Sequence, residues 1–325
     1  MTTATAEFTQ LRPLLFSVAY RMLGTASDVD DVLQEAWLRY SAAAGVRDAR
    51  AYLVRVVTRL CLDLLGSARV RRERYVGPWL PEPVLTGAAA GGGAPGSALA
   101  GGPAGTVDPV AVVERRELLS LGAVALLERL SPAERAVVVL REGLDYSHQE
   151  VAAAVGVSVE ASRQLLSRAR QRLAGGPVRR DADPEQHRRL LAALLEAFGA
   201  GDTATLVDLL RADVMVLSDG GGRVRAALRP IEGRDKVARF LAGIWPDLPA
   251  DAELGVVEIN GAPGLVAVRA GRLLFAAALQ VRDGAVAQVM IMTSPGKLGY
   301  LAAQLGHGTA VPGDYAAPGR RRDSP

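Results

Sequence analysis

The chain is poor in the residues that build disulfide frameworks, metal centres and aromatic cores. Its 325 residues include one cysteine, Cys61, and aromatic residues make up only 5 %. A single cysteine forms no internal disulfide, which excludes a disulfide-stapled scaffold and is typical of a reducing compartment. Because Cys61 lies in an apolar helical run, we expect it to be packed in a core rather than reactive. We expect no metal site and no cofactor.

Two further absences concern membranes. No apolar run approaches the ~18–20 residues that span a bilayer. The first residues also lack the basic-then-apolar pattern of a secretory signal. We therefore expect a cytoplasmic protein without membrane contact. Apolar residues make up 49 % of the chain, which is ample for the cores of two or three domains of about 100–200 residues each.

The net charge of +3 hides a strong segregation of charge. Residues 28–35 carry four acidic side chains and no basic one, whereas residues 50–74 and 161–180 are both rich in arginine. Two separate basic segments suggest two contacts with a polyanion. Two solvated helix faces would give the same pattern, so charge alone does not decide between these interpretations.

A segment rich in Gly, Ala and Pro, residues 86–107, divides the helical part of the chain. It has too few large apolar residues to bury a core and predicts a flexible linker. We assign a first helical domain to residues 1–75, a linker to 76–111 and a second helical domain to 112–175. A third domain is assigned to 184–305 and a disordered tail to 306–325.

Apolar residues recur at helical spacing in three runs of the first domain. In the second of these runs, Asp28, Asp31 and Glu35 fall on the face opposite the apolar residues. Glu35 and Arg39 are four residues apart and are expected to pair. An acidic helix face beside a basic helix calls for two partners, a protein surface for one and a nucleic acid for the other.

The second domain carries the pattern of a helix-turn-helix over residues 147–173. Ser131 and Ser147 each precede a glutamate by three residues, which predicts two capping boxes. The helix that Ser147 begins is expected to stop at Gly156, and Ser158 is expected to cap the next, longer helix. A short helix, a turn containing glycine and a longer helix match the spacing of a DNA-reading unit.

The longer helix has one polar face and one apolar face. Arg and Gln on its polar face are the side chains that bind guanine and adenine edges in the major groove. An ordinary surface helix of a bundle is the alternative. His148, in the first turn of the short helix, is expected to face solvent rather than bind a metal. The polar face consists of Glu160, Arg163, Gln164, Ser167, Arg168 and Gln171.

Three strings in this order resemble the extracytoplasmic-function (ECF) sigma factors of RNA polymerase. DVDDVLQEAWLRY (Asp28–Tyr40) is similar to the polymerase-binding helix of the σ2 domain, and the string Arg47–Tyr75 to the helix that opens the −10 promoter element. The string Leu127–Leu173 is similar to σ4, which reads the −35 element. The resemblance covers roughly residues 8–75 and 112–174. At Arg59 many family members have asparagine.

The resemblance assigns roles to individual residues. It implies promoter DNA and the β and β′ subunits of core polymerase as partners. The residues implied to dock on β′ are Asp28, Asp31, Gln34, Glu35 and Arg39. It implies contact with the −10 element by Arg47, Asp48, Arg50, Arg55, Arg59 and Asp63, the first two capturing an extruded base. It implies contact with the −35 element by Ser158 together with the polar face, above all by Arg163, Gln164, Ser167 and Arg168.

Further strings resemble the ECF subfamily that carries a fused C-terminal SnoaL-like domain. They are YVGPWLPEP (Tyr75–Pro83), DGGGR (Asp219–Arg223) and a degenerate SPGKL (Ser294–Leu298). If the first two touch, the C-terminal domain sets the spacing of σ2 and σ4, with Trp79 as an aromatic anchor. The residues expected to carry this interdomain regulation are Trp79, Leu80, Pro81, Asp219, Gly220, Gly221, Gly222, Arg223 and Lys297.

The fold class expected is therefore a multi-domain protein with two all-α sigma domains followed by an α+β cone. The σ2 domain is of the three-helix-bundle type and σ4 contains the helix-turn-helix. The third domain begins with helices at 184–199 and 204–210 and continues, around a helix at 235–245, with strand-like runs. Asn260-Gly261 and Asp283-Gly284 predict hairpin turns between those runs. Helices followed by a curved antiparallel sheet resemble the SnoaL-like, or NTF2-like, fold.

Some relatives with this cone are cyclases or isomerases, so an enzyme remains a rival hypothesis. Acid–base chemistry on a carbonyl substrate calls for a carboxylate with a His or Tyr partner. Residues 188–299 contain neither His nor Tyr, and Asp219 is the one plausible base. We favour a regulator acting in cis, with an unidentified small ligand left open and no separate anti-sigma factor required. A ligand-responsive helix-turn-helix regulator that works without polymerase is a second rival, although it has no need of the acidic helix.

Overall fold

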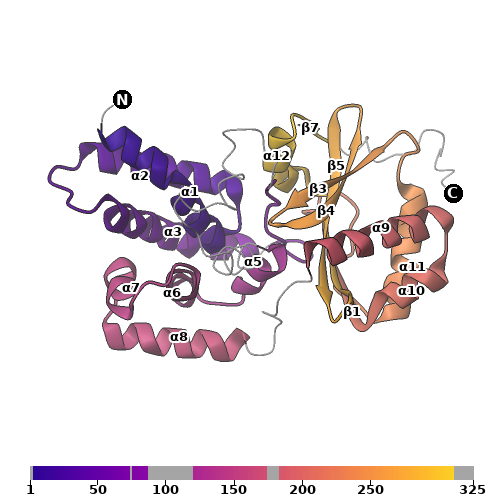
Figure 1. Ribbon diagram of the computed structural model, residues 1–325, viewed down its shortest axis with the longest axis horizontal. Helices are drawn as coiled ribbons and strands as arrows, with labels where there is room; N and C mark the ends of the chain where they lie inside the picture. Colours follow the sequence, from indigo (N-terminus) through magenta and orange to yellow (C-terminus); the bar gives the residue numbers. More distant parts are fainter. Residues whose placement is uncertain (1–2, 74, 87–119, 174–182, 311–325) are drawn as a thin grey trace. The chain divides into compact units, whose positions relative to one another are not determined.

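A computed structural model describes residues 3–73, 75–86, 120–173 and 183–310, with side chains described except those of Thr3 and residues 67–73. The chain forms two compact units, drawn in Figure 1. The first comprises residues 1–74 and 86–178 and is helical. The second comprises residues 75–85 and 179–325 and contains the sheet. No helix in the described ranges is long and apolar enough to cross a membrane.

Three helices begin the first unit: α1 (Thr3–Leu23), α2 (Ala26–Ala42) and α3 (Ala49–Glu73). They pack pairwise, and their inward residues include Leu15, Val29 and Leu53, all fully buried. Cys61 on α3 is also fully buried, and burial raises the pKa of its thiol. The prediction that this cysteine packs in a core is therefore confirmed.

The second helical set comprises α5 (Leu121–Leu127), α6 (Pro132–Gly143), α7 (His148–Val155) and α8 (Val159–Leu173). α6 also packs against α1 and α3. A buried guanidinium takes part in this packing. Arg135 is 2 % exposed and donates to the Met22 carbonyl and to Glu128, both at 2.6 Å. Burial lowers the pKa of Arg135 to about 10.

The second unit is an α+β domain with one mixed sheet. Its helices are α9 (Pro184–Ala200), α10 (Thr203–Leu209), α11 (Arg234–Ile244) and α12 (Pro295–Gln304), with a 3-10 turn η2 (Trp245–Asp247). Its strands are β1 (Leu210–Asp219), β2 (Ile231–Glu232), β3 (Glu253–Ile259), β4 (Ala262–Arg269), β5 (Arg272–Arg282), β6 (Ala285–Met292) and β7 (Gly308–Thr309). The order across the sheet is β2-β1-β6-β5-β4-β3, and β7 pairs with β5.

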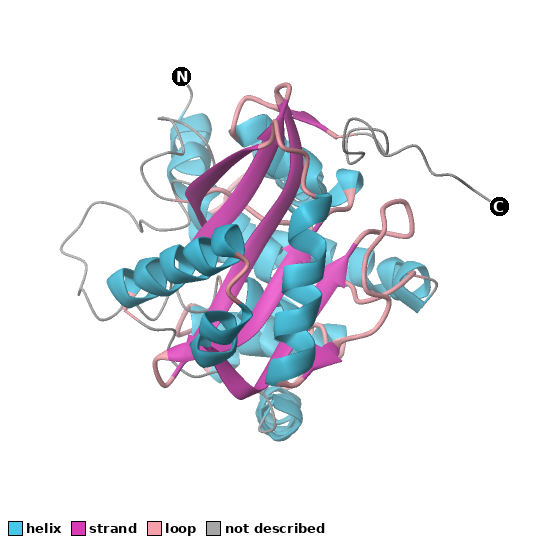
Figure 2. Cartoon of the chain, turned by 90° about the vertical axis from the view of Figure 1, so that its right-hand side faces the viewer, coloured by secondary structure: helices cyan, strands magenta, loops and turns pink. Residues whose placement is uncertain are grey.

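Helices α9, α10 and α11 cover one face of this sheet (Figure 2). Their buried residues, such as Leu194, Leu206 and Leu241, share one apolar core with β1, β4, β5 and β6. The core is aliphatic, as expected from a chain with few aromatics. Both predicted hairpin turns form, and Asn260 and Asp283 adopt positive φ angles of 53° and 52°, as the residue before the glycine of such a turn requires.

The structure departs from the expected domain plan in three places. Residues Tyr75–Leu85 belong to the second unit, although Tyr75 was assigned to the first domain and residues 76–85 to the linker. The sheet is not purely antiparallel, because β1 pairs with β6 in parallel. The tail assigned to 306–325 begins inside the fold, since Gly308 and Thr309 pair with β5 and Ala310 is 1 % exposed. Residues 311–325 and most of the predicted linker lie outside the described residues.

Candidate nucleic-acid interface

The helix-turn-helix is built by the caps that its sequence predicts. The Ser147 side chain accepts from the backbone of Glu150, and the Glu150 carboxylate accepts from the backbone of Ser147. Gly156 ends α7 in the left-handed region, with φ at 82°. The Ser158 hydroxyl accepts from the Ala161 amide at 3.0 Å and begins α8. The predicted capping box at Ser131 and Glu134 is also present on α6.

One face of α8 is buried and the opposite face is exposed. Leu165, Leu166 and Ala169 are 8 %, 6 % and 0 % exposed, and α8 packs against α6 and α7. The seven residues predicted to face a DNA groove are all exposed: Ser158, Glu160, Arg163, Gln164, Ser167, Arg168 and Gln171. The helix therefore presents a continuous polar surface.

The arginines of α8 fall into two groups. Arg170 pairs with Glu142 at 2.8 Å, and Arg172 pairs with the buried Glu134 at 2.6 Å, so both brace α8 against α6. Arg168 has no ion pair within the described part of the chain, and Arg163 pairs only with the exposed Glu160 on its own helix, at 3.3 Å. Arg163 and Arg168 are therefore the arginines available to a nucleic acid.

His148 is not the purely solvent-facing residue that the sequence suggested. It is half-buried, and its Nδ1 lies 2.9 Å from the hydroxyl of Ser162 on α8. Ser162 itself is fully buried. Burial lowers the pKa of His148, and the nearby guanidinium groups of Arg141, Arg163 and Arg170 lower it further.

A second polar surface lies on α3 and the turn before it. One side of α3 faces the core through residues such as Leu53 and Val57, both fully buried. Asp48 also has a local task, because its carboxylate accepts from the Ala51 amide at 2.9 Å at the start of α3. The predicted residues are all exposed: Arg47, Asp48, Arg50, Arg55, Arg59 and Asp63.

The outer face of α2 is mixed in character. Asp31, Gln34 and Arg39 are exposed, whereas Asp28 and Glu35 are half-buried. The predicted Glu35–Arg39 pair is present at 2.7 Å, and Asp28 accepts from the Thr25 hydroxyl at 2.6 Å. Sequence reasoning missed Leu38, which is 55 % exposed on this helix. Its break from the apolar repeat of α2 is the signal that identifies it.

In the second unit, the buried carboxylate of Asp219 gathers donors from three segments. Its Oδ1 accepts from the Tyr75 hydroxyl at 2.5 Å and from the Gly221 amide at 3.1 Å. Its Oδ2 accepts from the Leu80 amide at 2.8 Å and from Lys297 Nζ at 2.6 Å. Four donors occupy the acceptor positions of this carboxylate.

Lys297 lies close to two aromatic rings of the segment 75–85. Its Nζ is 4.0 Å from the ring centre of Trp79 and 4.6 Å from that of Tyr75, and it also donates to the Leu80 carbonyl. Burial, followed by the Asp219 contact, raises the pKa of Tyr75. Three of the strings singled out in the sequence therefore meet around one carboxylate. Of the residues predicted to carry interdomain regulation, Gly222 and Arg223 are exposed.

Residues 75–85, which we call the strap, continue along the sheet edge. The Val84 amide donates to Asn260 Oδ1 at 3.0 Å, and the Asn260 amide donates to the Val84 carbonyl at 2.9 Å. Leu85 forms a bridge with Ile259 and donates from its amide to Gln304 Oε1 at 2.8 Å. The sequence predicted Asn260 only as a turn residue and not as a partner of the strap, and it gave no signal for Gln304.

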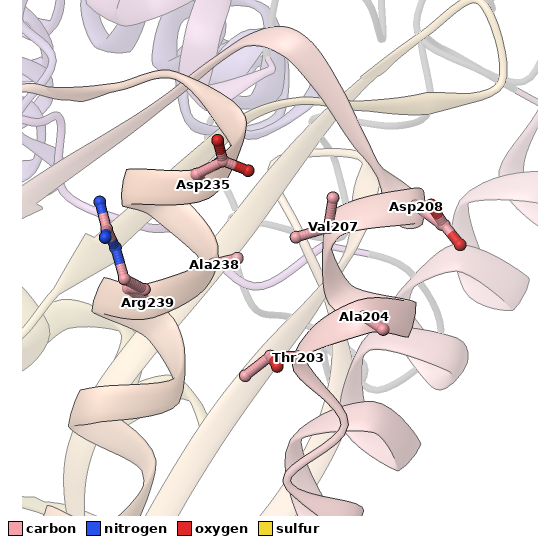
Figure 3. A pocket seen from close by; sticks show the side chains of 7 residues that line it. All are labelled: Thr203, Ala204, Val207, Asp208, Asp235, Ala238 and Arg239. Carbon is pink, nitrogen blue, oxygen red and sulfur yellow. The ribbon is translucent and has the colours of Figure 1, made fainter.

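A groove of about 540 Å³ lies between α10 and α11 (Figure 3). Its lining includes the carboxylates of Asp208 and Asp235 and the guanidinium of Arg239, with no histidine, cysteine or tyrosine. This groove offers no acid–base pair of the kind that an isomerase needs. Its full lining is Thr203, Ala204, Val207, Asp208, Asp235, Ala238 and Arg239.

Comparison with known proteins gives consistent matches. Residues 8–71 match the family described as Sigma-70 region 2, and residues 122–173 match Sigma-70, region 4. The ECF RNA polymerase sigma factor SigJ of Mycobacterium tuberculosis is 39 % identical, over 90 % of this chain and 92 % of that protein. A probable ECF sigma factor of that species, SigI, is 31 % identical over 91 % of this chain and 95 % of its own length. The crystal structure of SigJ superposes with a TM-score of 0.69, at 35 % identity, over 90 % of this chain and 98 % of that chain.

Proposed function

Because this chain belongs to the family of ECF RNA polymerase sigma factors, we propose that it joins core polymerase through α2 and reads promoters with α3 and α8. The observation that carries this proposal is the exposed polar face of α8, the second helix of a helix-turn-helix, which packs against the capped helices α6 and α7. In this assignment α8 contacts the −35 element in the major groove and α3 contacts the −10 element.

The α2 surface suits a protein partner better than DNA. Its carboxylates would repel phosphates, while an exposed leucine among charged residues is typical of an interface centre with a polar rim. Leu38 supplies the apolar contact and Asp31, Gln34 and Arg39 supply the polar contacts. The β′ subunit is the proposed partner of this face, with further contacts on β. The chain therefore works in the cytoplasm, where it meets core polymerase.

We propose that the second unit regulates in cis and is not an enzyme. A general base needs a free lone pair, and the Asp219 carboxylate already accepts from four donors. The same contacts are what a structural anchor requires, since a buried carboxylate must be paired and hydrogen-bonded. A small ligand in this unit would modulate the strap rather than be transformed, and a separate anti-sigma factor is not required.

We propose that the regulation works through the lengths of the segments that connect the domains. α3 ends at Glu73 and the anchored strap begins at Tyr75, so docking ties the σ2 helices to the second unit by a very short tether. Residues 174–183 join α8 to α9 of the second unit, and ten residues reach at most ~35 Å. Strap release lets the whole segment from Tyr75 to Ser120 span the σ2 and σ4 domains, a reach of ~150 Å. Docking therefore limits how far apart the two DNA-reading domains move.

Transcription with purified components tests this function. The chain added to core polymerase is expected to give promoter-specific transcripts, and removal of residues 184–325 is expected to change their yield. In the full chain, Trp79→Ala should change transcript yield without unfolding the helical domains. Val76→Ala, in the same strap but 52 % exposed, is the control. No transcript from any genomic promoter and no binding to core enzyme would refute the proposal.

A further inference from the structure

His148, in the first turn of α7, is a titratable residue hydrogen-bonded to α8. His148 Nδ1 is bonded to Ser162 Oγ at 2.9 Å, and Ser162 is fully buried between the two helices. Either neutral tautomer satisfies this bond, and so does the imidazolium form, in which Nδ1–H donates to the hydroxyl. Protonation therefore leaves the α7–α8 contact intact. In the imidazolium both ring nitrogens carry a hydrogen, and Nε2 has no partner among the described residues.

The surroundings of this imidazole are basic. Arg141 on α6 and Arg163 and Arg170 on α8 all act on it electrostatically. Each arginine is balanced in the free chain by an acid: Asp145 at 3.1 Å, Glu160 at 3.3 Å and Glu142 at 2.8 Å respectively. On α7 itself, the Glu150 carboxylate is held by the Ser147 cap. α3, which packs against α7, adds Arg50 and Asp48 near Glu150. The arginines outweigh the acids at His148, because their charges lower its pKa.

We propose that His148 is a phosphate-contact residue of the helix-turn-helix, which takes up one proton as the domain binds duplex DNA. This inference rests on the proposed function, because it places α8 in a DNA groove. The first helix of such a unit crosses the DNA backbone, where phosphate oxygens accept from side chains near the helix start. A solvent proton joins the imidazole, Nε2–H donates to a phosphate oxygen, and Nδ1–H keeps Ser162 in place.

The sign of the pH effect follows directly. Burial, and after it the three arginines, hold the pKa of His148 below its usual value in the free protein, so it is neutral near pH 7. A bound phosphate favours the imidazolium, so its pKa rises in the complex. DNA affinity should therefore increase as pH falls, by at most about tenfold per pH unit for one proton taken up. The chain has three histidines, and His187 is buried, which makes the effect assignable.

Binding of the full chain to a fluorescein-labelled random-sequence duplex tests this at one fixed salt concentration between about pH 8 and pH 5.5. Wild type should bind about five- to tenfold more tightly at the acid end. His148→Asn keeps an amide near Ser162 but cannot titrate, and its affinity should be nearly independent of pH. His307→Asn is the matched control and should keep the wild-type slope. An NMR titration of the histidines should show the His148 pKa rising when duplex is added.

A slope in His148→Asn equal to that of wild type would overturn the role of His148, and so would an unchanged His148 pKa on DNA binding. Either result would leave the sigma-factor function intact, because polymerase-dependent transcription at neutral pH is measured separately. Wild type that neither binds duplex nor supports transcription would overturn both.

Discussion

The ammonium of Lys297 lies 2.6 Å from the carboxylate of Asp219, and the two side chains are 9 % and 0 % exposed. The pair joins the start of α12 to the end of β1, and the strap closes over it through Tyr75, Trp79 and Leu80. A buried ion pair stabilises a fold only when its remaining hydrogen-bonding positions are satisfied. The strap supplies three of the groups that satisfy them, so strap docking and the ion pair depend on each other.

Asp219→Asn should release the strap and destabilise the second unit. The substitution leaves the Lys297 ammonium buried without a counter-charge, which costs about 3–5 kcal/mol. Denaturant unfolding of the full chain, followed by tryptophan fluorescence, measures the loss. Asp213→Asn removes an exposed carboxylate from the same strand and should cost little. Adding Lys297→Met to Asp219→Asn should recover part of the loss, and failure to recover any would argue against a charge-based cause.

Gly220→Ala should destabilise the turn after β1. A methyl group at this position would lie 2.2 Å from the carbonyl oxygen of Val224, so the backbone must move. We expect a loss of at least about 2 kcal/mol in the unfolding free energy, together with weaker strap docking. Gly199→Ala is the control, because nothing lies within 4 Å of that methyl group and α9 should gain about 0.5–1 kcal/mol. Equal effects of the two substitutions would contradict the steric argument.

Arg168→Ala and Arg172→Ala should separate DNA binding from folding. Arg168 has no ion pair within the described residues, so its loss should leave stability within about 0.5 kcal/mol and weaken promoter binding by about 1–3 kcal/mol. Arg172 pairs with the buried Glu134 at 2.6 Å, so its loss should lower stability by about 1–2 kcal/mol. Thermal unfolding and holoenzyme–promoter affinity measure the two effects. The reverse pattern would refute the division of the α8 arginines.

His187→Asn should flatten the pH dependence of stability of the second unit. His187 is 1 % exposed, its Nε2 has no partner among the described residues, and burial lowers its pKa to about 4. The unfolded chain, with a histidine pKa of about 6.5, therefore binds more protons between pH 6.5 and 4. Wild-type stability should fall by about 2–3 kcal/mol as pH drops across this window. Urea unfolding at several pH values measures this loss, and an equal loss in the variant would exclude His187 as its source.

The sequence predicted the helix ends of the helix-turn-helix closely, because they depend on interactions between residues near one another in the chain. The caps at Ser131, Ser147 and Ser158 and the stop at Gly156 depend on residues within four positions of one another. The hairpin turns at Asn260 and Asp283 are equally local, because they need only a residue that tolerates positive φ before a glycine. Exposure of the predicted α3 and α8 residues follows from helical periodicity.

Contacts between residues far apart in the chain were determined only by the tertiary structure. Tyr75 and Asp219 are 144 positions apart, so no periodicity shows that the strap folds with the C-terminal unit. The sequence singled out both strings, but the four donors around the Asp219 carboxylate come together only when three segments converge. The short strands β2 and β7 and the parallel pairing of β1 with β6 likewise depend on contacts between segments that are distant in the sequence. His148 looked like a surface residue because its partner, Ser162, lies on the next helix and is brought close only by helix packing.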